Sequence, residues 1–209
     1  MKSFEQGICE KEFDVSFNCS FADRLEMDDI GNRRLYLNDE VNSDTVEAIN
    51  YHIMRYNRLD KDVAVKDRVP IKLYIDSPGG DVTSGFSLID IIINSKTPIY
   101  TIGLGQVASM AFLIFLAGHK RYSLEHTEFL MHDGSSGAMA STAKMMDKMS
   151  FIKNMEEEVK KYIISHTKID ENVYMEKYRQ EWYLYSKEAQ KYGITDYILG
   201  KDCDIAEIV

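Results

Sequence analysis

The most constraining feature of the sequence is a strand pattern that leads through a short turn into a wholly apolar helix. Residues 99–103 form an apolar strand pattern, Gly105 follows, and Ser109 opens the apolar run 110–116. A helix that is apolar on every face has to be buried. We therefore expect Ser109 to lie at the carboxyl end of a strand, at the first turn of a buried helix.

Other strand and helix patterns alternate along the chain, which predicts an α/β fold with a parallel sheet and right-handed crossovers. Strands are expected at residues 33–37, 69–75, 99–103, 120–124 and 128–131. Helices are expected after the capping residues 42–44 and at residues 82–94, 109–116 and 142–166. The prolines fall where expected strands begin or end, at Pro70, Pro78 and Pro98.

The composition limits the function classes. A chain of 209 residues favours one domain with a substantial core. The net charge of −9 argues against a nucleic-acid-binding surface. The longest apolar run, residues 111–118, is far shorter than the roughly 20 residues of a membrane span. The first residues lack an apolar signal core, so we expect a cytoplasmic protein that does not enter a membrane.

The cysteines suggest neither a disulfide framework nor a metal site. Cys9, Cys19 and Cys203 form no CxxC motif and leave an odd count, which is typical of reduced thiols. We expect no metal and no cofactor.

Ser109 and His132 are the candidate nucleophile and general base. A serine hydroxyl attacks efficiently only when a positioned base removes its proton. His132 ends an apolar strand and precedes Asp133, so it can be held firmly and still project into a site. The other four histidines lie in helical or turn patterns, where a structural or solvent-exposed role is expected (His52, His119, His126 and His166).

The oxyanion that forms during acyl transfer needs backbone N–H donors close by. Gly79 and Gly80 lie in the turn that follows the strand pattern 69–75. Gly80 has no side chain to keep a peptide away from its N–H. The Met110 N–H, at the first turn of a helix, lacks an intrahelical acceptor. We expect Gly80 and Met110 to be the donors.

Four motifs, in this order and spacing, resemble the ClpP-type proteolytic subunit of the Clp protease. They are Ser77-Pro78-Gly79-Gly80, Gly105-Gln106-Val107-Ala108-Ser109-Met110, Met131-His132, and Ser186-Lys187-Glu188-Ala189 with Tyr192-Gly193-Ile194-Thr195-Asp196. The resemblance implies a crotonase-like superhelix of ββα units and a serine endopeptidase that works through an acyl-enzyme. It also implies an assembly of two stacked heptameric rings, into which an AAA+ unfoldase feeds peptide or unfolded protein.

The third catalytic residue stays open. The family's separation from the histidine leads to Glu181, whereas counting back from residues 186–189 leads to Trp182. A glutamate can orient the imidazole and stabilise its charged form. Glu181 is the favoured residue, with Asp170 or no acid as the alternatives.

Two segments are assigned outside the central motifs. Residues 1–32 are polar and weakly patterned, and are interpreted as an N-terminal arm with a pore role, ahead of a peptidase domain at 33–209. Residues 133–167 match the family's handle, which protrudes and joins the rings. Methionines cluster there at positions 139, 145, 146, 149 and 155, which suits a subunit interface.

Two other functions remain possible from the sequence. A chain without an acid to support His132 would be a catalytically weak, structural subunit of the same type. A crotonase-fold acyl-CoA enzyme also holds an oxyanion with two backbone N–H groups, but relies on carboxylates and does not need Ser109 paired with His132.

Overall fold

The computed structural model describes residues 20–134 and 141–209. The chain divides after Asn32 into two units. In the first unit, helix α1 (Phe21–Gly31) begins at Ser20, which forms a capping box with Asp23. No residue of α1 is buried, so this helix contributes nothing to the core. Residues 1–19 of the arm, which include Cys9 and Cys19, lie outside the described residues.

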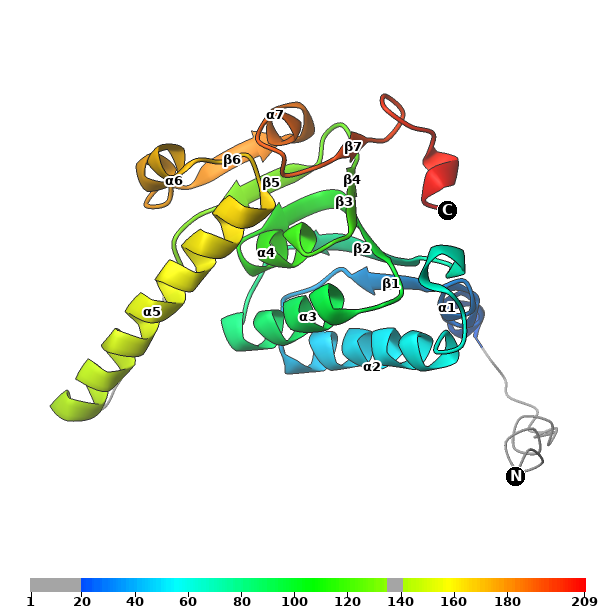
Figure 1. Cartoon of the computed structure of the whole chain (residues 1–209), viewed down its shortest axis with the longest axis horizontal. Helices are drawn as coiled ribbons and strands as arrows, with labels where there is room; N and C mark the ends of the chain where they lie inside the picture. The colour runs from blue at the N-terminus through cyan, green and yellow to red at the C-terminus, as the bar shows by residue number, and fades with distance from the viewer. Residues whose placement is uncertain (1–19, 135–140) are drawn as a thin grey trace. The chain divides into compact units, whose positions relative to one another are not determined.

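The second unit is built on a largely parallel sheet (Figure 1). The parallel strands β1 to β4 and β7 follow one another in the order β1 (Arg34–Leu37), β2 (Ile71–Ser77), β3 (Ile99–Ala108), β4 (Lys120–Ser123) and β7 (Tyr197–Ile198). Strand β3 is long enough to pair with β4 through Tyr100–Gly103 and, further along, with β5 (Glu128–Met131) through Gln106–Ala108. Strand β6 (Trp182–Tyr185) runs antiparallel to β5.

Helices surround this sheet. They are α2 (Ser43–Leu59), α3 (Val82–Asn94), α4 (Met110–Leu116), α5 (Thr142–His166), α6 (Glu171–Lys177) and α7 (Ser186–Lys191), with short 3-10 turns η1 (Val65–Asp67) and η2 (Ile205–Glu207). Helix α2 begins where the sequence predicts, because Asn42 accepts hydrogen bonds from two backbone N–H groups of the first turn. The described helices include none with the length and apolar character of a membrane span.

The predicted α/β class and parallel sheet are confirmed, with two differences. Strand β3 continues past Gly103 to Ala108, so Ser109 follows the strand directly. The segment after His166, for which the sequence analysis made no assignment, contains α6, β6, α7 and β7, and its strand β6 breaks the all-parallel expectation.

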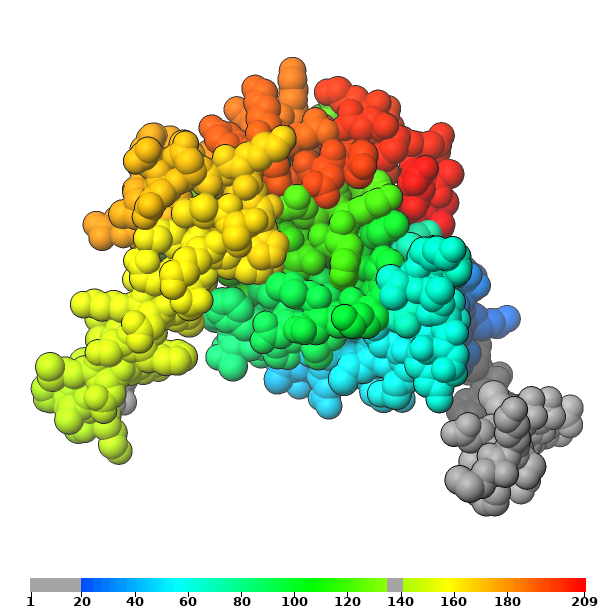
Figure 2. Space-filling model, in the orientation of Figure 1, coloured from blue at the N-terminus to red at the C-terminus, as the bar shows by residue number. Residues whose placement is uncertain are grey.

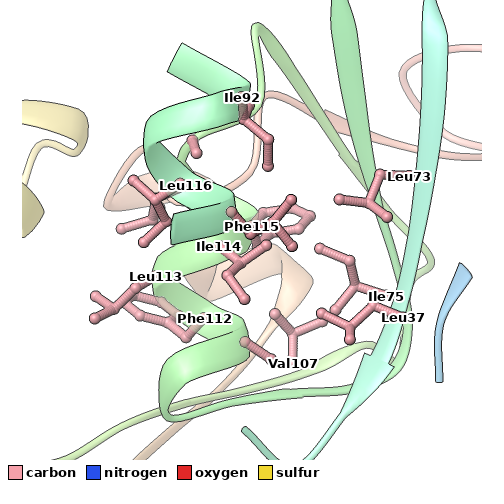
Figure 3. Close-up of a cluster of buried hydrophobic side chains, with 14 of the residues drawn as sticks. Leu37, Leu73, Ile75, Ile92, Val107, Phe112, Leu113, Ile114, Phe115 and Leu116 are labelled. Carbon is pink, nitrogen blue, oxygen red and sulfur yellow. The ribbon is translucent and has the colours of Figure 1, made fainter. Parts of the chain in front are cut away.

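The predicted buried helix is α4, and all seven of its residues are buried. Figure 3 shows Ile114 and Phe115 of α4 facing the sheet residues Leu73 and Ile75, with Ile92 of α3 close by. Burial of one large apolar side chain stabilises a fold by about 1.5–3 kcal/mol, so this helix is a major contributor to the core. The turn at Ser109 is consequently held by a helix that has little freedom to move.

Helix α5 differs because only its last part joins the core. Ile163 is its one buried residue, whereas every residue from Thr142 to Phe151 is exposed. Figures 1 and 2 show the first half of α5 extending away from the rest of the second unit. Near its end, the Tyr162 hydroxyl donates to the Leu113 carbonyl oxygen at 3.1 Å and ties α5 to α4. Met139, one of the predicted methionine cluster, lies outside the described residues.

Candidate active site

Ser109 has a backbone conformation that side-chain-bearing residues rarely adopt. Its φ is 53° and its ψ is −120°, and Arg33 is the one other non-glycine residue with positive φ in the described part of the chain. Such a conformation costs on the order of 1–3 kcal/mol and persists only where its surroundings enforce it. Here the Ser109 N–H donates to the Leu130 carbonyl oxygen at 2.9 Å, and the buried helix α4 follows at once.

The Ser109 hydroxyl does not cap the helix that it precedes. Ser109 occupies the N-cap position of α4, yet its side chain makes no capping hydrogen bond. A serine that only starts a helix places its oxygen on an N–H of the first turn. Ser109 is therefore not an ordinary helix cap, and its half-buried hydroxyl is available for other contacts.

Gly79 packs directly against this turn. A Cβ added to Gly79, whose φ is 92°, would lie 2.6 Å from the Ala108 carbonyl oxygen and 2.7 Å from Ser109 Cβ. The next residue, Gly80, forms a parallel bridge with Val41 and has a φ of 149°. The Gly79-Gly80 turn and the Ser109 turn are distant in sequence, and they lie together because β2 and β3 are paired neighbours.

His132 comes to the same edge of the sheet through β5. The pairing of Ala108 with Leu130 puts Ser109 and His132 just beyond the carboxyl ends of neighbouring parallel strands. This edge is where α/β proteins usually bind ligands. The His132 Nε2 is buried and has no hydrogen-bond partner among the described residues. A buried polar atom without a partner calls for a functional explanation.

Ser109, Met110 and His132 line one cavity of about 150 Å³. The chain's five histidines all lie in the described residues, and His132 alone among them lines this cavity. Gly79 and Gly80 are not among its lining residues. The structure therefore brings the predicted serine, histidine and one predicted N–H donor to a common space, with Gly79 packed against the Ser109 turn.

Neither acidic candidate forms a hydrogen bond with His132 within the described residues. The Glu181 carboxylate accepts a hydrogen bond from the Tyr183 hydroxyl at 2.7 Å and is exposed. Met131 is paired with Trp182 across β5 and β6, so one further step of this antiparallel register sets Glu181 opposite His132. Asp170 caps α6 by accepting from the Val173 N–H at 2.9 Å, and it does not line the cavity. The third catalytic residue stays a prediction.

The sequence analysis missed one wall of the cavity. Helices α5 and α6 supply it through residues that include Met155, Glu156, Val159, Tyr174 and Tyr178. The sequence predicts the helix over residues 142–166 but not this cavity, which is lined by Ile152, Met155, Val159 and Ile163 of α5. The tyrosines stand four residues apart on and just after α6, with ring centroids 5.5 Å apart, and carried no signal of their own.

Tyr174 in this wall is neutral, and the described residues offer no group of side chains for a metal ion. Burial is the main cause that raises the pKa of Tyr174 to about 12, so its hydroxyl stays protonated at neutral pH. Among residues 20–134 and 141–209, no three His, Cys, Asp or Glu side chains converge in a way that could hold a metal ion.

Comparison with known proteins identifies the family of this chain. The Clp protease family model matches residues 27–202. The proteolytic subunit 2 of an ATP-dependent Clp protease from Treponema denticola is 32% identical over 187 residues, which cover 88% of this chain and 90% of that protein. The subunit of the same name from Treponema pallidum is 29% identical and covers 83% of this chain and 85% of its own length.

The fold has solved counterparts as well. A ClpP1 mutant from Listeria monocytogenes superimposes with a TM-score of 0.72 at 24% identity, covering 84% of this chain and 95% of that one. The chain therefore has the ClpP fold and belongs to the Clp protease family of peptidases.

Proposed function

We propose that this protein is a serine endopeptidase in which Ser109 is the nucleophile and His132 is the general base. The observation that carries the proposal is the cavity that Ser109 and His132 both line. The Ser109 hydroxyl, in a strained turn, makes no helix-capping hydrogen bond, and the buried His132 Nε2 has no hydrogen-bond partner among the described residues. Acyl transfer uses these two groups together, and neither a helix cap nor a packed core histidine accounts for them.

The reaction runs in two halves. The Ser109 hydroxyl oxygen bonds to the carbonyl carbon of the scissile peptide while His132 Nε2 takes the hydroxyl proton. His132 then passes this proton to the amine nitrogen as the C–N bond breaks, which leaves an acyl-enzyme. Water repeats the sequence, with His132 as base, and frees Ser109.

The oxyanion is held by backbone N–H groups. Met110 is the first residue of α4 and its N–H has no intrahelical acceptor, while the dipole of α4 places partial positive charge at this end. Gly80 supplies the second N–H in this proposal. Its extended, positive-φ backbone pairs with Val41, and its N–H donates to no acceptor within the described residues. Gly79 keeps the two donors close through its packing on Ser109.

The proposed working form is an assembly of two stacked seven-membered rings served by an AAA+ unfoldase. Two relatives described above are named as subunits of ATP-dependent Clp proteases. The exposed apolar side chains on the first half of α5 fit the ring–ring contact (Met145, Met146, Met149 and Phe151). A monomer would leave this surface in water.

A catalytically weak subunit of the same family is the second candidate. The observation that favours it is the engagement of Glu181 with Tyr183, which leaves His132 without a carboxylate in the described residues. The family match gives no support to the acyl-CoA enzyme considered from the sequence.

Hydrolysis of a short fluorogenic peptide amide tests the proposal. Ser109→Ala is expected to lower kcat/KM by at least roughly 1,000-fold, because a triad without its nucleophile retains only the oxyanion site and substrate binding. Ser165→Ala is the matched control, since Ser165 is an exposed serine on α5 outside the cavity. Undiminished hydrolysis by Ser109→Ala would exclude Ser109 as the nucleophile, and an inactive wild type would favour the weak subunit.

A further inference from the structure

Two loops meet next to the Ser109 turn and are joined by backbone hydrogen bonds. Residues 39–41 follow β1, and residues 78–81 follow β2. The Val41 N–H donates to the Gly79 carbonyl oxygen at 2.8 Å, and the Asp81 N–H donates to the Val41 carbonyl oxygen at 2.7 Å. Val41 is fully buried, so water does not compete for these two bonds. The loop after β1 therefore holds the glycine loop on both sides of Gly80.

The same bonds fix the direction of the Gly80 N–H. The Gly79 carbonyl and the Gly80 N–H belong to one trans peptide unit, in which the two groups point in opposite directions. Because the carbonyl faces Val41, the N–H faces away from the loop after β1. The orientation of this N–H, which the proposed function assigns to the oxyanion, consequently depends on how Gly79 is held.

The Ser77 side chain holds Gly79 at its N–H. Ser77 is the last residue of β2 and is fully buried. Its hydroxyl donates to the Asp39 carbonyl oxygen at 2.6 Å and accepts from the Gly79 N–H at 3.2 Å. Pro78 lies between the two residues and has no N–H, so Gly79 offers the first N–H after Ser77. One hydroxyl thus connects the loop after β1 to the glycine that Val41 binds at its carbonyl.

We propose that Ser77 is a positioning residue, which sets the direction of the Gly80 N–H through its hold on Gly79. Its partners are one acceptor and one donor, and a hydroxyl serves both. Preorganised N–H donors act on the charge that develops in the transition state, so their misalignment slows the chemical step more than it weakens substrate binding. This inference rests on the proposed function, because the Gly80 N–H matters only if an oxyanion forms at Ser109.

Ser77→Ala tests the inference with a short peptide amide as substrate. The variant is expected to lower kcat about tenfold, a fraction of the loss that follows removal of a whole oxyanion donor, and to leave KM within about twofold. Ser77→Cys keeps the shape of the side chain with a weaker donor. Its kcat is expected to lie between those of Ser77→Ala and the wild type, and it supplies the test if Ser77→Ala does not fold.

Ser95→Ala is the matched control. The Ser95 hydroxyl also has one acceptor and one donor, since it donates to the Thr97 carbonyl oxygen at 2.6 Å and accepts from Asn57 Nδ2 at 2.8 Å. Ser95 follows the carboxyl end of α3 and does not line the cavity. Its variant is expected to lose thermal stability and to keep the wild-type kcat. A fall in kcat as large as that of Ser77→Ala would overturn the inference.

A peptidyl trifluoromethyl ketone supplies a readout that lost stability alone would not move. The Ser109 oxygen bonds to the ketone carbon, the hydroxyl proton passes to His132, and the former carbonyl oxygen becomes an oxyanion. Carbon-13 NMR over a pH series measures the pKa of the hydroxyl that this oxyanion forms on protonation. Ser77→Ala is expected to raise that pKa, because N–H donors favour the charged form and a misaligned donor favours it less.

The outcomes separate this inference from the proposed function. A wild-type kcat in both Ser77 variants, or an adduct pKa that Ser77→Ala leaves unchanged, would overturn the inference while hydrolysis by the wild type still supported Ser109. A wild type that neither hydrolyses the peptide nor forms the adduct would instead overturn the proposed function and the inference with it.

Discussion

The backbone at Ser109 shows how single residues prepare this site. A positive φ on a serine is unfavourable, and it is enforced by the hydrogen bond to Leu130 and by the buried helix that follows. In this conformation the hydroxyl makes no helix-capping hydrogen bond, and Ser109 lines the same cavity as His132. The cost of the strained turn is thus linked to the availability of the hydroxyl that we propose as the nucleophile.

Glu181 is predicted to orient the His132 imidazole once its carboxylate turns away from Tyr183. Rotation of its carboxylate away from Tyr183 would let it accept a hydrogen bond from the His132 Nδ1–H, since the strand register sets the two residues opposite each other. Glu181→Gln is expected to lower kcat by roughly 100-fold or more while keeping the fold, because an amide favours the wrong imidazole tautomer. Single-turnover acylation rates measure this step.

Asp170→Asn is the comparison variant for Glu181. It alters the cap of α6 alone, so its stability should fall by about 1 kcal/mol or less and its kcat should be unaffected. An inactive Asp170→Asn together with a fully active Glu181→Gln would reverse the assignment. Full activity in both would mean that neither carboxylate orients the imidazole.

Among the elements, β1, α2 and β3 are joined by an ion pair in which Asp60 is buried and Arg33 is half-buried. Arg33 donates to both Asp60 oxygens, at 2.6 and 2.7 Å, and the Thr97 hydroxyl donates to Asp60 Oδ2 at 2.8 Å. Arg33 just precedes β1, Asp60 ends α2, and Thr97 stands just before β3. The guanidinium is the main cause that lowers the pKa of Asp60 below its ordinary 3.8.

This pair predicts a pH-dependent stability. Because the folded pKa of Asp60 is lowered, its contribution is complete above pH 3.8 and is lost as pH falls through the lowered value. Asp60→Asn is expected to cost about 3 kcal/mol of unfolding free energy at pH 7, and progressively less in more acidic solution. Urea unfolding at several pH values measures the difference. Asp62→Asn, an exposed change in the same loop, serves as the control, and a pH-independent cost for Asp60→Asn would refute the linkage.

Local patterns predict some of these elements and not others. The all-apolar run of α4, the cap at Asn42 and the prolines beside β2 and β3 are encoded within a few residues, so the sequence predicts them correctly. Strand β6 gains its partner only through pairing with β5, some fifty residues earlier in the chain, and its short run carries no period that separates it from a loop.

Some residues of the candidate site are likewise predictable from local sequence and others are not. Ser109, His132 and the glycines stand in recognisable motifs at strand ends, whereas the cavity wall from α5 and α6 exists only after folding brings residues 152–178 against α4. Glu156 carried no signal in the sequence, because an exposed glutamate on a helix is ordinary. Its placement beside an apolar cavity is a tertiary property.

For the whole molecule, the exposed apolar part of α5 predicts a large ring assembly. Light scattering is expected to give a mass many times 24.1 kDa. Met146→Glu, at a side chain that is 68% exposed, should shift the protein to smaller species, because a charge in an apolar contact is costly. Val65→Glu makes the same kind of change on η1, at a residue that is 53% exposed, and should leave the mass unchanged. A wild-type monomer at micromolar concentration would contradict the assembly.

The central claim is that Ser109 is an activated nucleophile, and a fluorophosphonate probe tests it most directly. The probe forms a covalent bond with a serine oxygen that an adjacent base has activated and leaves ordinary serines unmodified. Intact-mass measurement followed by peptide mapping is expected to find one adduct per chain, on Ser109, and none in His132→Ala. Absence of labelling in the assembled wild type, or an adduct on a different serine, would contradict the account.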